Sequence, residues 1–176
     1  MIRCTPISKN KLKSIAVEFR KRFHVECLAF PVLDIIEDLH CTGLLNLQIV
    51  EDADLKLTKD QLALYELKTN TMYVKLSVYN EALNNIGRSR FTLAHELSHY
   101  LLLYVLKFDV EETEVDVKPY EDPEWQANYL AGELLAPSQE TVDFSVDNYM
   151  EKCLLSEECA IVLKKKREKK NWNKII

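Results

Sequence analysis

One segment, RFTLAHELSHYLL from Arg90 to Leu102, constrains the fold more than any other part of the chain. Its apolar residues recur at steps of three and four, which predicts a helix with one buried face. His95 and His99 are four residues apart on this helix, so both imidazoles project from one face and can reach the same ion. Glu96 stands beside the first histidine, where a carboxylate can take a proton from a nearby water molecule. The spacing therefore predicts a metal site with Glu96 as its catalytic carboxylate.

The alternative interpretation places both histidines and Glu96 on the solvent-exposed face of an ordinary helix. Histidine is rare in this chain, with four in 176 residues, so a chance occurrence of the pattern would be rare. The neighbouring Ala94, Leu97 and Leu101 indicate a core helix. Polar side chains buried there need partners, and a bound metal ion supplies one. The sequence therefore favours the metal site.

A catalytic zinc site takes three protein ligands and keeps one position open. Leu102 and Val105 stand where an extended three-histidine pattern would have glycine and histidine, which excludes that pattern. The five cysteines are too scattered along the chain to supply the missing ligand. We therefore expect one zinc ion whose third ligand is a carboxylate on another element.

Glu124 is the main candidate for that third ligand. Asp122 and Pro123 predict the start of a helix, because aspartate is a good N-cap and proline suits the first helical position. Glu124 then lies in the first turn, where the helix dipole favours its ionised form. It shares a face with Ala127 and Asn128, and a small residue there would let this helix pack closely on the histidine helix. The competing carboxylates are Glu121, Asp122 and Glu133.

The rest of the chain is typical of two helices, a small sheet and then further helices. This order predicts an α+β fold, with a small mixed sheet and a hairpin packed on several helices, rather than alternating β-α-β units. Arg20, Lys21 and Arg22 fall on the wet side of the first helix, and Ser89 is the candidate N-cap of the histidine helix. The predicted elements are helices over 11–23 and 31–43, a strand over 44–50, a hairpin of 62–66 and 71–76, and helices over 89–105, 123–137 and from 156 onward.

Composition limits the class of protein. A net charge of −5 at pH 7 argues against a protein that coats nucleic acid. No apolar run is long enough to span a bilayer, and no apolar segment typical of a signal peptide follows the first residues. The cysteines form no closely spaced pair, which is typical of a reducing compartment. We therefore expect a cytoplasmic protein without membrane contact.

The end of the chain differs from the rest in charge. We expect one main domain over residues 1–140 and a helical extension over 141–176 that ends in a basic tail. Six of the seven residues from Lys164 to Lys170 are basic. Such a run is more often a solvated helix end than a contact with phosphate, so we expect no direct contact with nucleic acid.

Two segments together resemble the ImmA/IrrE family of zinc-dependent metallopeptidases. They are RSRFTLAHELSHYLL, residues 88–102, and EWQANYLAGELLAP, residues 124–137, which are similar to the family's RFTLAHELGH and E-x-x-A-N-x-F-A-x-x-L-L-x-P. The likeness extends over about residues 10–140. It implies a zincin-like domain in which His95, His99 and Glu124 hold the metal and Glu96 is the general base.

The same resemblance implies a substrate. Members of the family typically cut a transcriptional repressor, so we expect an endopeptidase whose partner is a helix-turn-helix repressor. The alternative is a non-catalytic anti-repressor that binds and sequesters a regulator through the same domain. Ser98 stands where the family usually has glycine, and a histidine often found after the first motif is absent. The residue that stabilises the oxyanion is left open among Tyr100, Tyr104, Tyr120 and Tyr129.

Overall fold

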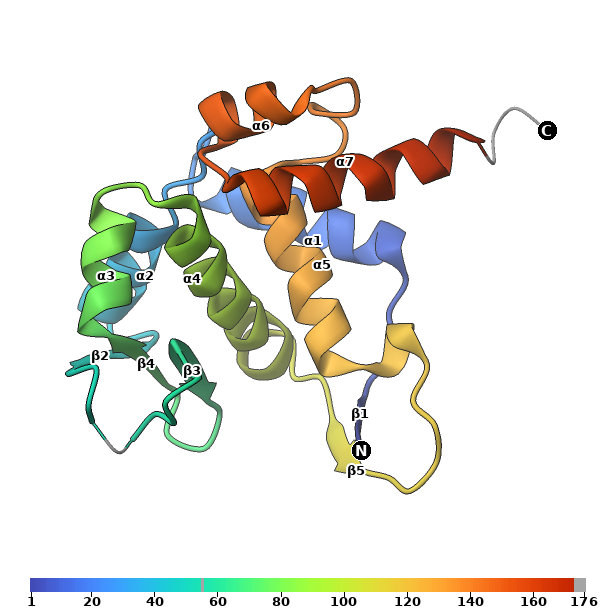
Figure 1. Cartoon of the computed structure of the whole chain (residues 1–176). Helices are drawn as coiled ribbons and strands as arrows, with labels where there is room; N and C mark the ends of the chain where they lie inside the picture. The colour runs from blue at the N-terminus through green and yellow to red at the C-terminus, as the bar shows by residue number, and fades with distance from the viewer. Residues whose placement is uncertain (55, 173–176) are drawn as a thin grey trace.

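Two helices, α4 (Gly87–His99) and α5 (Pro123–Leu135), lie side by side at the centre of the computed structural model (Figure 1). The structure describes residues 1–54 and 56–172, with side chains as far as residue 168. Ala94 on α4 and Ala127 on α5 are fully buried, and small side chains let two helix backbones approach closely. The predicted close packing of these two helices is therefore confirmed.

Helices surround this central pair, and two small sheets lie at its edges (Figure 1). The predicted α+β class is confirmed. No helix among the described residues is both long and apolar enough to cross a membrane. The other elements are β1 (Ile2–Cys4), α1 (Lys9–Arg22), α2 (Val32–Cys41), β2 (Asn46–Val50), β3 (Ala63–Glu66), β4 (Thr71–Lys75), α3 (Leu76–Leu83), a π-helix (Tyr100–Val105), β5 (Val110–Glu112), a 3-10 helix (Pro119–Glu121), α6 (Val146–Cys153) and α7 (Glu157–Trp172).

The larger sheet is mixed, as expected, with the strand order β2-β4-β3. β2 runs parallel to β4, and β3 and β4 form the antiparallel hairpin predicted from the sequence. Asn70 closes the hairpin with a positive φ of 49°, a conformation that asparagine tolerates well. β3 is therefore an edge strand, and it packs against α4.

Several local predictions were wrong for identifiable physical reasons. α4 begins at Gly87 with Ile86 as its N-cap, and Ser89 is instead buried and donates its hydroxyl hydrogen to Glu81. Arg20 is buried rather than solvent-exposed, because its guanidinium donates hydrogen bonds to carbonyl oxygens of α5 and of the segment after α1. Leu76 begins the helix α3, which the strand prediction overran. The predictions also missed β1 and β5, both of which are short, and did not resolve α6 as a separate helix within the predicted helical extension.

Hydrogen bonds from Arg167 join the C-terminal helix α7 to the end of α5 and the segment that follows it. Arg167 donates hydrogen bonds to the Ala136 carbonyl, the Thr141 hydroxyl and the Tyr149 hydroxyl, and it is buried. The division of the chain at residue 140 stays a prediction. So does the role of the basic tail, whose side chains beyond residue 168 lie outside the described part of the chain.

Candidate metal centre

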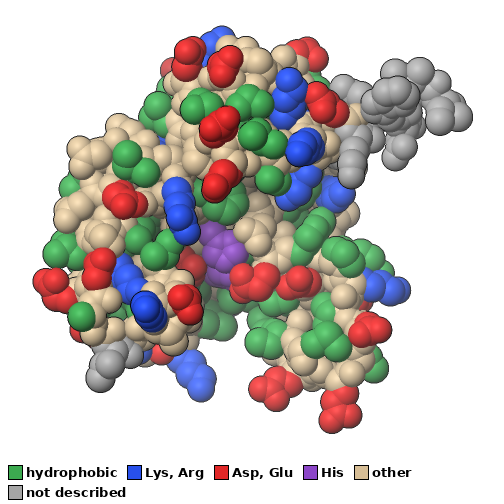
Figure 2. Space-filling model, viewed as in Figure 1, with side chains coloured by type: hydrophobic (Ala, Val, Ile, Leu, Met, Phe, Trp, Pro, Cys, Tyr) green, Lys and Arg blue, Asp and Glu red, His purple; other side chains and the backbone are tan. Residues whose placement is uncertain are grey.

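α4 presents His95 and His99 on the side that faces the start of α5. Their Nε2 atoms lie 3.0 Å apart, and their ring centroids lie 4.7 Å apart. This closeness follows from the four-residue spacing, because residues one helical turn apart project from the same face. Figure 2 shows a histidine surface at the centre of one face of the molecule, at the head of a hollow between two lobes.

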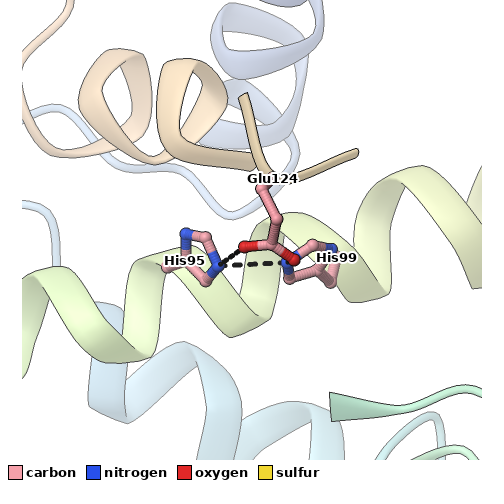
Figure 3. A group of neighbouring side chains, drawn as sticks. All are labelled: His95, His99 and Glu124. Carbon is pink, nitrogen blue, oxygen red and sulfur yellow. Dashed lines mark hydrogen bonds and ion pairs between the residues drawn. The ribbon is translucent and has the colours of Figure 1, made fainter. Parts of the chain in front are cut away.

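The start of α5 brings Glu124 to the two rings (Figure 3). Asp122 caps the helix by accepting a hydrogen bond from the Glu124 backbone N–H at 2.9 Å, and Pro123 holds the first helical position, as predicted. The Glu124 carboxylate then lies 3.1 Å from His95 Nε2 through one oxygen and 3.3 Å from His99 Nε2 through the other. The structure therefore brings the three predicted ligands together, with one candidate ligand atom from each within 4.8 Å of the others.

The charges around this group favour an ionised carboxylate. Hydrogen bonds from His95 and His99 hold the pKa of Glu124 well below its ordinary value, although burial acts in the opposite direction. Burial lowers the pKa of His95, but the hydrogen bond to Glu124 and the charges of Glu96 and Glu124 outweigh it, so the net shift of this pKa is upward. Two imidazoles therefore share one carboxylate, whose charge favours a proton on an imidazole or a cation bound between the three groups.

The donor set suits a metal ion. Two imidazole nitrogens and one carboxylate oxygen are the ligands of a common type of catalytic zinc site. Each ring must offer a lone pair at Nε2, which requires its hydrogen to be on Nδ1. His95 Nδ1 lies 3.2 Å from the side-chain oxygen of Asn128 on α5 and can donate there. Asn128 therefore favours the ring form of His95 that a metal needs.

The orienting contact of Asn128 was not predicted from the sequence. The sequence analysis placed Asn128 only on the same helix face as Glu124, which comes one helical turn earlier. The available signal was its four-residue spacing from Glu124, which places both side chains on the α4 side of α5. An amide at this position can hold a ligand ring without binding the metal itself.

Glu96 lies outside the ion-pair group and is held separately. It is 8% exposed, and its Oε2 accepts a hydrogen bond from the backbone N–H of Tyr65 at 2.7 Å. This N–H points away from β4, because the hydrogen bonds between the two strands use the other side of β3. The edge strand therefore fixes the carboxylate next to the histidines. A backbone contact of this kind leaves no mark in the sequence.

The competing residues serve other parts of the structure. Asp122 caps α5, and Glu121 and Glu133 accept hydrogen bonds from the backbone N–H groups of Lys118 and Ser138. Tyr100 donates its hydroxyl hydrogen to the Leu44 carbonyl. Tyr104 stacks on Tyr100, and Tyr129 stacks on Trp125. An oxyanion role for any of the four tyrosines stays a prediction.

Comparison with known proteins agrees with this geometry. Residues 54–150 match the model of a peptidase family, Peptidase M78, described as the IrrE N-terminal-like domain. The comparison with curated proteins found no significant match. The matched region covers more than half of the chain and contains both histidines, Glu96, Glu124 and Asn128. The chain therefore belongs to the Peptidase M78 family of IrrE N-terminal-like domains.

Proposed function

We propose that this protein is a zinc-dependent endopeptidase in which His95, His99 and Glu124 hold one zinc ion. The observation that carries the proposal is the convergence of these side chains from two helices, with the carboxylate 25 positions beyond the second histidine. Membership of a peptidase family supports it. The donor set also fits zinc better than a hard cation such as magnesium, which prefers oxygen ligands.

Glu96 is the general base of this proposal. A bound zinc ion would supply a polarised substrate carbonyl and an acidified water molecule. Glu96 would take the proton of that water and later give it to the leaving amine. The hydrogen bond from Tyr65 supports this role, because it holds the carboxylate in place without using both of its oxygens. Burial in a site with little water would further strengthen its electrostatic contacts.

The edge of β3 is where an extended substrate would lie. Tyr65 turns its backbone away from β4 and toward α4, so one edge of the strand faces the candidate metal centre. An extended peptide can add to a sheet edge through main-chain hydrogen bonds, and here it would pair beside Tyr65, whose own N–H is already bonded to Glu96. A peptide bound there would pass the histidines. This placement supports an endopeptidase, which cuts within a chain.

A transcriptional repressor of the helix-turn-helix class is the substrate we propose, and the cytoplasm is then the place of action. The family assignment supports a protein substrate. The rival function is sequestration, in which the domain binds a regulator and leaves it intact. The presence of Glu96 beside the first histidine favours cutting, because a protein that only binds has no need of a base there.

Incubation of the zinc-loaded chain with candidate repressors separates the two functions. We expect fragments by mass spectrometry, with their formation prevented by a chelator and restored by added zinc. A stable complex with intact repressor, formed equally with and without the chelator, would support sequestration and contradict the proposed peptidase.

A further inference from the structure

A groove opens beside the candidate metal centre, between α4, α5 and α7. Its volume is about 520 Å³, and Asn128, which contacts His95, is part of its wall. It continues into a second hollow of about 310 Å³ toward α1, since the two share Trp125, Asn128, Tyr129, Leu163 and Lys166. A peptide that crosses the histidines could therefore extend into the groove without leaving the protein surface.

The walls of the groove are largely apolar. Phe91 on α4 and Trp125 and Tyr129 on α5 contribute aromatic side chains, and Val162 and Leu163 on α7 contribute aliphatic ones. Val162 is 47% exposed, so a bulky substrate side chain could bury it. A large apolar side chain gains most from such a surface, because burial stabilises in proportion to the apolar area removed from water.

Two glycines and one arginine hold α7 in place as a wall of the groove. A Cβ at Gly87 would overlap the backbone of Ser156, so only glycine lets α4 approach the start of α7. A Cβ at Gly132 would lie 3.1 Å from Leu163 Cδ2, so glycine at this position lets the Leu163 side chain of α7 lie against α5. Arg167 fastens the middle of α7 to the segment after α5. The wall is therefore built into the fold. α7, which forms this wall, lies beyond the region matched to the family, residues 54–150.

Charge distinguishes this groove from the rest of the molecule. The chain carries a net charge of −5, yet basic side chains outnumber acidic ones along the two hollows. Figure 2 shows basic side chains over α7 with acidic ones among them, and further acidic ones beside the histidine surface, on the side toward β5. The groove would therefore attract an acidic peptide segment more strongly than a basic one. The basic residues are Lys9, Lys13, Arg88 and Lys166, against the acidic Glu133 and Glu158; Arg167 also lines the second hollow, but it is buried and bonded to protein oxygens.

We infer that this groove selects the substrate: it binds a peptide segment with a large apolar side chain next to the cleaved bond and an acidic residue further along. The inference rests on the proposed peptidase function, because the groove borders the candidate metal centre at Asn128, which contacts His95. α7 then sets the specificity of this chain through Val162 and Lys166.

A pool of fluorescein-labelled decapeptides tests the inference on the full zinc-loaded chain. The pool varies one position among Leu, Phe, Ala and Ser and another among Glu, Gln and Lys. We expect cleavage next to Leu or Phe in peptides that carry Glu. Lys166→Glu should raise KM for the Glu peptides by about tenfold while kcat changes little, since it replaces an attraction by a repulsion. Val162→Trp should fill the groove and shift the preference from Leu and Phe to Ala and Ser.

Two matched variants control for surface changes. Lys165→Glu changes a neighbouring exposed lysine of α7 that does not line the groove, and Val17→Trp changes a valine of similar exposure, 45%, on α1. Both should keep the wild-type preference. Thermal unfolding checks that all four variants are folded.

The outcomes separate this inference from the proposed function. If Lys166→Glu and Val162→Trp cleave peptides with unchanged preference, the inferred role of the groove in selecting the substrate is contradicted. The proposed peptidase function is then unaffected. If no peptide is cut, anisotropy of the labelled Glu peptides on the same chain decides. Binding that weakens in Lys166→Glu would support the groove and contradict the peptidase, whereas no binding would overturn the groove as well.

Discussion

The two ends of α5 differ in the charged groups that they meet. At its C-terminal end, Arg20 donates to the Leu134 carbonyl and Arg167 to the Ala136 carbonyl. These cations meet the negative end of the helix dipole and the carbonyls that a helix end leaves without partners. At the N-terminal end, Glu124 faces two imidazoles that also present electron pairs. At the C-terminal end the helix carbonyls have arginine donors within the protein. At the N-terminal end the Glu124 carboxylate favours a proton on an imidazole or a bound cation.

The difference shows how a structural polar cluster can be told from a functional one. In the Arg167 cluster three N–H donations of the guanidinium meet buried oxygen acceptors, so donors and acceptors are matched within the protein and the group stabilises the fold. In the histidine cluster a carboxylate and two imidazole nitrogens converge, and a proton on an imidazole or a bound cation turns their closeness into attraction. Changes at the two ends should therefore have different effects, on stability at one and on metal binding and activity at the other.

Glu96→Gln should give the largest effect. Glutamine keeps the shape and can accept the hydrogen bond from Tyr65 but cannot take a proton, so peptide cleavage should fall by about a thousandfold while zinc stays bound. Steady-state cleavage and metal analysis of the purified variant measure the two effects. Wild-type activity in this variant would show that Glu96 is not the base.

Arg167→Ala should have the largest effect on stability. It leaves the Ala136 carbonyl and the Tyr149 hydroxyl without their buried partner, which should cost about 3 kcal/mol of unfolding free energy. The matched change Lys165→Ala, at an exposed position of the same helix, should cost less than about 0.5 kcal/mol. Denaturant unfolding of the zinc-free chain measures both, and similar values for the two variants would remove the contrast between the ends of α5.

Asn128→Ala should weaken zinc binding by about 10- to 100-fold without unfolding the chain, because His95 loses the group that orients its ring. Asn128→Asp keeps an acceptor at the same place and should restore most of the affinity. Competition with a zinc-binding dye measures the affinities. Equal weakening by alanine and aspartate would mean that the amide acts through packing rather than through the ring of His95.

Glu124→Ala in the zinc-free chain should have the smallest effect, at most about 1 kcal/mol, because the side chain is 64% exposed and water screens its ion pairs. The pKa of Glu124 is lowered, so its contribution is present above its ordinary pKa of 4.5 and is lost as the pH falls through the lowered value. The pKa of His95 is raised, so its contribution is present below 6.5 and is lost as the pH rises through the raised value.

The difference in stability between the zinc-free wild type and Glu124→Ala should therefore be greatest between pH 4.5 and 6.5. Unfolding by denaturant at pH 5.5 and at pH 8.5 measures it. A difference that is larger at pH 8.5 would contradict the assigned pairing of Glu124 with His95.

The histidine pair and the start of α5 were predictable from the residues, because these features are local, whereas the final choice of Glu124 among four carboxylates as the third ligand came from the family resemblance. The spacing of His95 and His99 fixes their common face, and the Asp122 cap fixes where α5 starts and so where Glu124 lies. The hairpin was also predictable, since its two strands are joined by a short turn. In each case neighbouring residues determine the geometry.

Contacts between distant residues and backbone groups were not predictable in this way. Arg20 was assigned to the solvent because its own helix gives no sign of the Leu134 carbonyl, 114 positions later. The role of Gly87 in placing α7, and the backbone contact of Tyr65 with Glu96, depend equally on the tertiary fold. β1 and β5 pair across more than 100 residues, and each is too short to show a period.

Zinc binding by the metal-free full chain shows whether His95, His99 and Glu124 are the metal ligands. Calorimetric titration should give one ion per chain for the wild type and for Glu121→Ala, an acidic neighbour that the structure places outside the cluster. His95→Ala, His99→Ala and Glu124→Ala should each weaken binding by at least about 100-fold. Wild-type affinity in all three variants would contradict the account, because the converging side chains would then not be the metal ligands.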